Sequence, residues 1–230
     1  MLERVPVTHA AARKIQAMIL GGELKPGERM PSQREFAATL KVSRASLREA
    51  LLTLETLGLL RTEPGRGTFV AQHKPSRGRN MARWRYADSY SESDVFQTRI
   101  MLETRIVSLS ALSLRLDQLD ALDRATDVME QYWEAGDLLS NVEADLEFHG
   151  VIVSACPNRM LVDLYQSARD LLTETQIQPI PMTDPERMRE SIGEHRLIVA
   201  ALRARNAAKA AAEMQNHIRN TARCAGLDLR

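Results

Sequence analysis

Residues 31–70 read PSQREFAATLKVSRASLREALLTLETLGLLRTEPGRGTFV, and this stretch decides the fold of the first third of the chain. Ser32, followed three residues later by Glu35, forms a capping box that predicts the start of a short helix. Ser43 is the expected N-cap of a second helix, and Gly58 is placed to end it. The second helix carries an inward stripe at helical spacing: Leu47, Ala50, Leu51, Leu54 and Leu57.

The residues between and after these helices predict a tight turn and a hairpin. Lys41 occupies the turn, and a left-handed backbone there would cost lysine roughly 1 kcal/mol relative to glycine. Residues 60–63 and 68–70 are expected to pair as strands across the turn Pro64-Gly65-Arg66-Gly67. The stretch therefore predicts a winged helix-turn-helix with a small β wing.

Basic residues mark the surface that such a unit would present to DNA. Arg44 and Arg48 are four residues apart, so they share one exposed face near the start of the second helix. Arginine there can bind guanine with two hydrogen bonds. Gly65 and Gly67 let the tip around Arg66 approach a phosphate or the minor groove closely. Any one of these arginines alone is most simply a solvated surface charge, but the ordered set favours DNA binding.

Three motifs resemble the winged helix-turn-helix of the GntR family of bacterial repressors. They are Pro31-Ser32-x-Arg34-Glu35, Val42-Ser43-Arg44-x-x-Leu47-Arg48-Glu49-Ala50 and Gly65-Arg66-Gly67-Thr68-Phe69-Val70. The resemblance implies a double-stranded operator as partner. It also implies a set of DNA-contacting residues: Arg34, Ser43, Arg44, Ser46, Arg48, Gly65, Arg66 and Gly67.

Composition points to a helical protein of one large or two small domains. The chain has 230 residues, 44% hydrophobic and only 4% aromatic, which fits a core rich in leucine and alanine. No run of eighteen apolar residues predicts a membrane span, and the N-terminus lacks the apolar core of a signal peptide. Two cysteines do not make a disulfide framework. We therefore expect a cytoplasmic protein with no membrane partner.

Charge separates the chain into two parts. Residues 1–80 contain 14 Lys and Arg against 7 Asp and Glu, a net charge of +7, whereas the remainder contains 17 against 23, a net charge of −6. The basic part is the one expected to meet nucleic acid. We predict a DNA-binding domain at 1–72, a linker at 73–92 and a helical effector-binding and dimerisation domain at 93–230.

The second part has helical apolar spacing throughout, so the fold class is mainly α. Breaks at glycine, proline and asparagine divide it into six predicted helices. Together these form one bundle: Asp94–Leu114, Leu116–Glu134, Leu138–Ala155, Asn158–Gln176, Pro185–Arg203 and Ala207–Cys224.

Four ligand-type residues fall within the apolar stripes of this bundle. Asp145 and His149 are one turn apart on the third bundle helix, and His195 and His217 lie on the inward faces of the fifth and sixth. A buried, unpaired carboxylate is costly, and a shared divalent cation would offset that cost. Three imidazoles and a carboxylate suit zinc best, with nickel or manganese as alternatives. The competing interpretation is that each histidine is a hydrogen-bonded core residue.

The bundle also resembles the effector-binding domain of the FadR-type branch of the GntR family. The resemblance rests on Asp145-x-x-x-His149, Glu194-His195-Arg196 and Met214-x-x-His217. It implies a metal held by one Asp and three His, with a small carboxylate bound beside it. In Arg99-x-x-x-Glu103 it assigns the arginine to the effector and the glutamate to structure. Six helices in the bundle would resemble the VanR-like subgroup.

The sequence therefore predicts a metabolite-responsive, homodimeric transcriptional regulator on a palindromic operator, most simply a repressor released by an organic acid. Two alternatives remain. One is a metal-dependent hydrolase, because three His and one Asp can also activate water. The other is a DNA-binding protein that needs no effector. Turnover of candidate acids by the protein would support the hydrolase. Operator binding that no metabolite changes would support the effector-independent DNA-binding protein.

Overall fold

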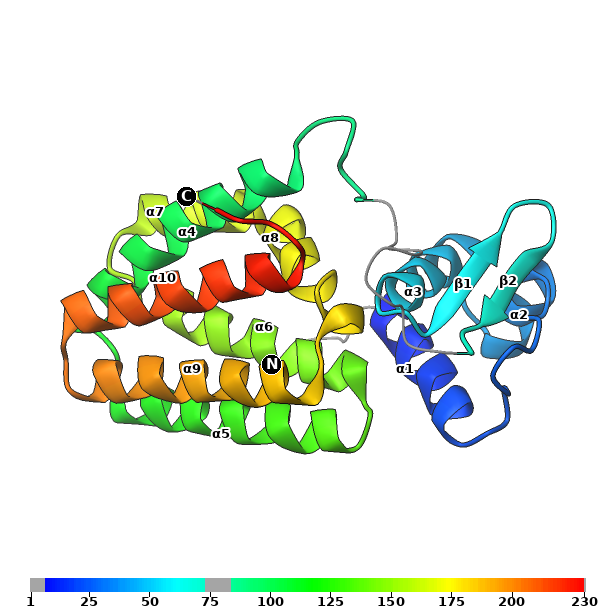
Figure 1. Ribbon diagram of the computed structural model, residues 1–230, viewed down its shortest axis with the longest axis horizontal. Helices are drawn as coiled ribbons and strands as arrows, with labels where there is room; N and C mark the ends of the chain where they lie inside the picture. Colours follow the sequence, from blue (N-terminus) through cyan, green and yellow to red (C-terminus); the bar gives the residue numbers. More distant parts are fainter. Residues whose placement is uncertain (1–6, 73–83, 230) are drawn as a thin grey trace. The chain divides into compact units, whose positions relative to one another are not determined.

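The computed structural model describes residues 7–72 and 84–229, with the side chains of residues 7–9 left out (Figure 1). The chain divides into two compact units, Met1–Ala82 and Arg83–Arg230. The first holds the predicted helix-turn-helix and the second the predicted bundle. Most of the predicted linker at 73–92 lies outside the described residues, so its bounds stay a prediction.

In the N-terminal unit, three helices precede a two-stranded wing: α1 (Val7–Leu20), α2 (Gln33–Leu40), α3 (Arg44–Thr56), β1 (Leu60–Glu63) and β2 (Gly67–Val70). The capping box of Ser32 and Glu35 is present. The stripe predicted for α3 is buried, including Leu47 and Leu54 at 0% exposure. Lys41 does adopt the left-handed conformation, with φ 56° and ψ 43°.

The wing differs from its prediction in two details. β2 begins at Gly67, one residue earlier than predicted. A third extended segment pairs with β2, since the Met30 N–H donates to the Thr68 carbonyl at 2.8 Å and the Val70 N–H to the Glu28 carbonyl at 2.9 Å. This segment follows a Pro-Gly turn and has no strand pattern of its own, so its pairing depends on tertiary structure.

The C-terminal unit is helical throughout its described residues: α4 (Glu92–Ser110), α5 (Leu116–Glu134), α6 (Leu138–Ser154), α7 (Arg159–Ser167), α8 (Arg169–Ile177), the 3₁₀ turn η1 (Ile180–Met182), α9 (Pro185–Arg203) and α10 (Ala207–Cys224). α4 packs against α10, α10 against α9, α9 against α5, α5 against α6, and α6 against α4. These five helices therefore close a ring whose interior holds the core and the site described below (Figure 1).

The prediction of six bundle helices is wrong. The segment predicted as one helix over Asn158–Gln176 is broken into α7 and α8 at Ala168, where φ −97° and ψ 1° depart from helical values. Neither glycine nor proline marks this break in the sequence. Because the VanR-like assignment depended on six helices, it loses its basis. The break matters for the site, because α8, on the far side of it, supplies the pocket residue Gln176.

Candidate metal centre and nucleic-acid interface

The side chains predicted to contact DNA lie at the surface of the N-terminal unit. Arg34 on α2 and Arg44 and Arg48 on α3 are exposed, and the side chain of Arg66 in the wing is 72% exposed. The Ser43 hydroxyl accepts the Ser46 N–H at 3.0 Å, which caps α3. The positive end of the α3 dipole thus lies beside two arginines, an arrangement that suits phosphate groups.

The wing tip depends on its two glycines. Gly65 has φ 72° and Gly67 φ 115°, both in the region that side-chain-bearing residues rarely adopt. Between them, Arg66 extends from the turn and pairs with Glu63 at the end of β1. The turn therefore presents a cation at the tip of the hairpin.

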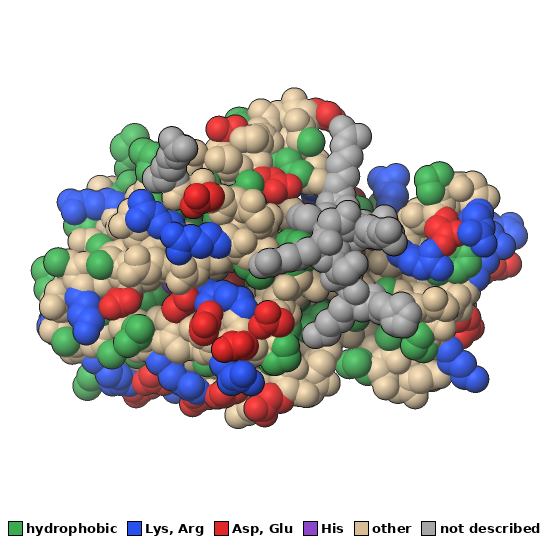
Figure 2. Space-filling model, in the orientation of Figure 1, with side chains coloured by type: hydrophobic (Ala, Val, Ile, Leu, Met, Phe, Trp, Pro, Cys, Tyr) green, Lys and Arg blue, Asp and Glu red, His purple; other side chains and the backbone are tan. Residues whose placement is uncertain are grey.

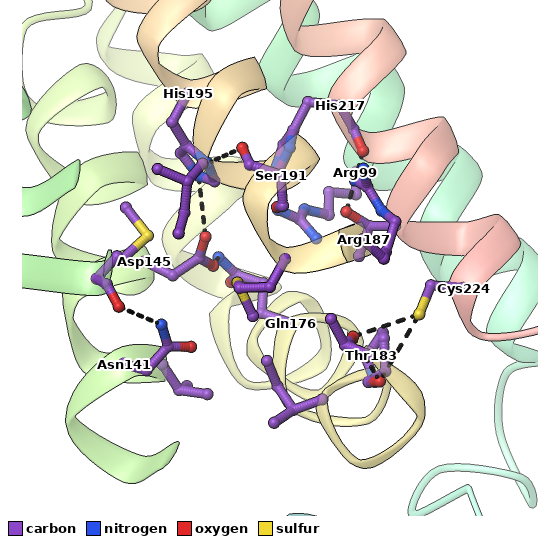
Figure 3. A pocket seen from close by; sticks show the side chains of 17 residues that line it. Arg99, Asn141, Asp145, Gln176, Thr183, Arg187, Ser191, His195, His217 and Cys224 are labelled. Carbon is purple, nitrogen blue, oxygen red and sulfur yellow. Dashed lines mark hydrogen bonds and ion pairs between the residues drawn. The ribbon is translucent and has the colours of Figure 1, made fainter. Parts of the chain in front are cut away.

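In the bundle, the four predicted metal ligands come together. Asp145, His149, His195 and His217 each offer one ligand atom within 4.8 Å of the others. The three imidazole centroids are 4.3 to 5.9 Å apart. All three histidines are at most 2% exposed, whereas the side chain of Asp145 is 20% exposed. In Figure 3, Asp145 and His195 meet at the pocket wall, with His217 and Arg99 nearby.

Each histidine is oriented by an acceptor bonded to its Nδ1. The Nδ1 of His195 lies 2.7 Å from the Ser191 carbonyl, which can only accept. The Nδ1 of His217 lies 2.9 Å from Glu194, and the Nδ1 of His149 bonds to Glu103. With the Nδ1 protons directed to these outer acceptors, the Nε2 lone pairs face the interior, where that of His149 lies 3.3 Å from a terminal nitrogen of Arg99.

This arrangement fits a cation better than a self-contained polar core. The Nε2 of His195 is buried without a hydrogen-bond partner, although Asp145 Oδ1 is only 3.0 Å away. With Nδ1 carrying the proton, these two atoms are both acceptors, and a positive ion between them would remove their repulsion. The other carboxylate oxygen of Asp145, Oδ2, accepts a hydrogen bond from Gln176 Nε2 at 2.6 Å.

The charges around the cluster favour the forms that ligate metal. Burial, reinforced by His195, lowers the pKa of His217 to about 4, so its imidazole is neutral near pH 7. Burial alone would raise the pKa of Glu103, but His149 and Arg99 hold that pKa at about 2. Burial would also raise the pKa of Glu194, but hydrogen bonds from His217 and Arg187 hold that pKa at about 2. Both outer carboxylates are therefore ionised acceptors.

A pocket opens from this cluster toward the end of α10. Its walls mix apolar residues with polar ones such as Asn141, Gln176 and Thr183 (Figure 3). Arg99 lines the pocket but is fully buried. Its Nε donates to Glu103 at 2.7 Å, and its terminal nitrogens lie 3.4 Å from Thr175 Oγ1 and 3.3 Å from His149 Nε2.

The sequence did not reveal most of the outer contacts. Glu103, interpreted as structural, bonds both Arg99 and His149. Glu194 joins α9 to His217 on α10 and is itself held by Arg187 at 2.8 and 2.9 Å. The position of Glu194 directly before His195 was the available signal, but its target is set by how α9 and α10 pair. No sequence signal indicated Ser191 or Gln176.

Comparison with known proteins gives two domain matches. The FCD domain matches residues 94–220, and bacterial regulatory proteins of the gntR family match residues 8–70. The chain is 29% identical over 209 residues to the Uxu operon transcriptional regulator of Escherichia coli (strain K12), covering 90% of this chain and 81% of that protein. It is 29% identical over 210 residues to the transcriptional regulator LutR of Bacillus subtilis (strain 168), covering 88% of this chain and 94% of that protein.

One relative of lower sequence identity and two solved structures are similar over most of the chain. The repressor NanR of Cronobacter sakazakii is 26% identical over 221 residues, covering 94% of this chain and 84% of that protein. A GntR transcriptional regulator from Rhodococcus sp. RHA1 has a TM-score of 0.55 at 21% identity, covering 98% of this chain and all of that chain. McbR/YncC of E. coli has a TM-score of 0.52 at 21% identity, covering 94% of each chain. These two structures support the fold alone.

Proposed function

The chain belongs to the GntR family of bacterial regulatory proteins, with the FCD domain of its FadR-type branch, and we propose that it is a repressor released from DNA by a small organic acid. It is a metabolite-responsive, DNA-binding transcriptional regulator, as its named relatives are transcription regulators. No helix within the described residues combines the length and apolar character that a membrane crossing requires. The observation that carries the proposal is the inward-facing cluster of Asp145, His149, His195 and His217 beside a pocket.

The cluster would hold one divalent transition metal, zinc in preference to nickel or manganese. Asp145 would supply a carboxylate oxygen, and the three histidines would supply Nε2. Ser191, Glu103 and Glu194 would keep the rings in the tautomer that exposes Nε2. A bound ion supplies positive charge and open coordination positions at the pocket wall.

A carboxylate is the ligand chemistry that this wall favours. The side chain of Asp145 is 20% exposed, so the cluster can be reached from the pocket. Arg99 contributes a second positive charge next to His149, and its guanidinium could pair with the same effector carboxylate. Binding of the acid can change operator affinity only by its differential affinity for the two states of the protein.

The test uses operator DNA obtained by selection from a random duplex pool with the zinc-loaded protein. We expect at least one acid from a panel of small mono-, di- and hydroxycarboxylates to weaken operator binding about fivefold or more. Chelation of the metal should remove that response. A protein that converts one of the acids catalytically would overturn the proposal in favour of an enzyme. If no acid changes operator affinity, an effector-independent DNA binder replaces it.

We further predict a homodimer on a palindromic operator, because one winged unit contacts a single half-site. Large exposed apolar residues lie on two helices that contact each other, Met101 (75% exposed) on α4 and Met160 (71% exposed) on α7. Burial of these two side chains in a dimer would remove their apolar surface from water. Sedimentation at micromolar concentration should give a dimer for the wild type and a monomer for Met101→Asp/Met160→Asp. Leu197→Asp, on an exposed position of α9, should stay dimeric. A wild type that is monomeric with and without DNA would contradict the prediction.

A further inference from the structure

Gln176 on α8 contacts a candidate metal ligand and also lines the pocket. Its side-chain amide brings two different atoms to this place. The nitrogen Nε2 donates to Asp145 Oδ2 at 2.6 Å, while Asp145 Oδ1 lies 3.0 Å from His195 Nε2 in the cluster. Figure 3 shows Gln176 beside Asp145 at the pocket wall. Gln176 therefore positions a metal ligand with its nitrogen and has its oxygen available for another partner.

The orientation of this amide follows from its partner. A carboxylate oxygen accepts hydrogen bonds, so the amide atom that contacts Asp145 is the nitrogen, and the oxygen Oε1 faces away from that contact. Gln176 is 5% exposed, and its Oε1 is buried with no hydrogen-bond partner among the described residues. A buried acceptor without a donor costs free energy, and a donor on a ligand in the pocket removes that cost.

The neighbouring polar side chains of the pocket direct their donors elsewhere. Asn141 Nδ2 donates to a backbone carbonyl at 2.8 Å. The hydroxyls of Thr183 and Thr221 each donate to a backbone carbonyl at 3.0 Å. These donors are satisfied within the protein, whereas the Oε1 of Gln176 is not. The pocket therefore has, beside the candidate metal centre, an acceptor that a ligand can satisfy.

We propose that Gln176 is a specificity-determining residue, which selects an effector with a hydroxyl group on a carbon close to its carboxylate. This inference rests on the proposed function, in which an effector carboxylate binds at the cluster. Because Nε2 of the same amide contacts Asp145, Oε1 lies beside the set of metal ligands. The effector hydroxyl donates to Oε1, and an analogue with hydrogen in its place leaves that acceptor unpaired.

A hydroxyl fits this position better than an ammonium group, which can also donate. The divalent metal that the cluster would hold outweighs the single negative charge of Asp145, and Arg99 lines the same pocket. An ammonium group there is repelled, whereas a neutral hydroxyl is not. Figure 2 shows Lys and Arg side chains intermixed with Asp and Glu side chains on the visible face of the bundle. The charge on that face favours neither sign, so selection falls to the pocket.

The test compares acids that differ by one hydroxyl group, using the full-length protein at saturating zinc. The pairs are lactate and propionate, malate and succinate, and citrate and tricarballylate. In isothermal titration calorimetry, the wild type should bind the hydroxy acid of at least one pair roughly 5- to 150-fold more tightly than its partner. Free alanine, which has an ammonium group where lactate has its hydroxyl, should bind no more tightly than propionate.

Gln176→Met separates the role of the amide from that of the metal. It keeps the approximate shape of the side chain and removes Oε1, so the preference for the hydroxy acid should shrink by roughly fivefold or more. A preference that comes from chelation of the metal by the hydroxyl would remain. The matched control is Gln178→Met, since Gln178 is also 5% exposed but lies outside the pocket lining. This control should keep the preference of the wild type, and circular dichroism establishes that both variants are folded.

The outcomes distinguish this inference from the proposed function. If the wild type binds every acid without the hydroxyl as tightly as its hydroxy partner, Gln176 selects no hydroxyl, although an acid effector still stands. The same conclusion follows if Gln176→Met keeps the full preference or if alanine binds more tightly than lactate. If no acid binds and none changes operator affinity, the proposed function fails together with the inference.

Discussion

Alanine at both Arg44 and Arg48 is expected to weaken operator binding by about 2–6 kcal/mol, or roughly 30-fold to more than 10,000-fold. Both side chains are exposed on one face at the start of α3, where a recognition helix contacts base edges. A bidentate contact to guanine contributes about 1–3 kcal/mol of discrimination, and the two arginines are close enough that their effects need not be additive.

The measurement is a gel shift or anisotropy titration on the selected operator and, in parallel, on an unrelated duplex. Loss of base contacts should reduce specific binding more than nonspecific binding, so the ratio between the two should shrink. Lys14→Ala/Lys25→Ala is the matched control, since it removes two exposed charges of the same unit outside the helix-turn-helix and the wing. Unchanged operator affinity of the Arg44/Arg48 variant would remove these residues from the interface.

The local elements were predictable because their signals are local. The capping box of Ser32 and Glu35, the αL turn at Lys41 and the buried stripe of α3 each depend on residues within a few positions of one another. The α5, α9 and α10 bounds match their predictions for the same reason, since glycine, proline and asparagine mark the ends. The break at Ala168 carries no such residue, so the sequence pattern does not reveal it.

The four candidate ligands could be found because polar residues within apolar helical stripes must point inward. The second layer around them could not be found in this way. Which side chain orients His217 depends on the register of α9 against α10, and the pairing of His149 with Glu103 depends on α6 lying against α4. The strand-like pairing of residues 28–30 with β2 is likewise a contact between segments far apart in sequence. Sequence periodicity describes faces of elements and says nothing of which faces meet.

Substitution of His195 by alanine is expected to have the largest effect on the bundle. His195 is 1% exposed, and its unpartnered Nε2 lies 3.0 Å from Asp145 Oδ1. We predict about one transition-metal ion per chain, six-coordinate or nearly so, with the protein supplying four positions. A ligand at 100 times its Kd stabilises the fold by about 2.7 kcal/mol, so zinc should raise the melting temperature of the wild type and a chelator should lower it.

The loss of zinc affinity should be larger for a variant of a metal ligand than for a variant of a residue that orients a ligand. Glu194→Gln changes the acceptor that holds His217 but leaves all four ligands, so zinc affinity should fall roughly 10- to 100-fold. His195→Ala removes a ligand outright, so its zinc affinity should fall further than that of Glu194→Gln. The variant should show neither the zinc-dependent rise in melting temperature nor the response to acids. Because the metal centre and the DNA-reading residues lie in different units, binding to a duplex of arbitrary sequence should stay near that of the control Arg189→Ala, an exposed position on α9. Elemental analysis of protein purified without chelator tests whether the chain carries a transition metal. If the wild type carries no transition metal, and added zinc or nickel changes the melting temperature of none of these proteins, the four residues are a hydrogen-bonded polar core.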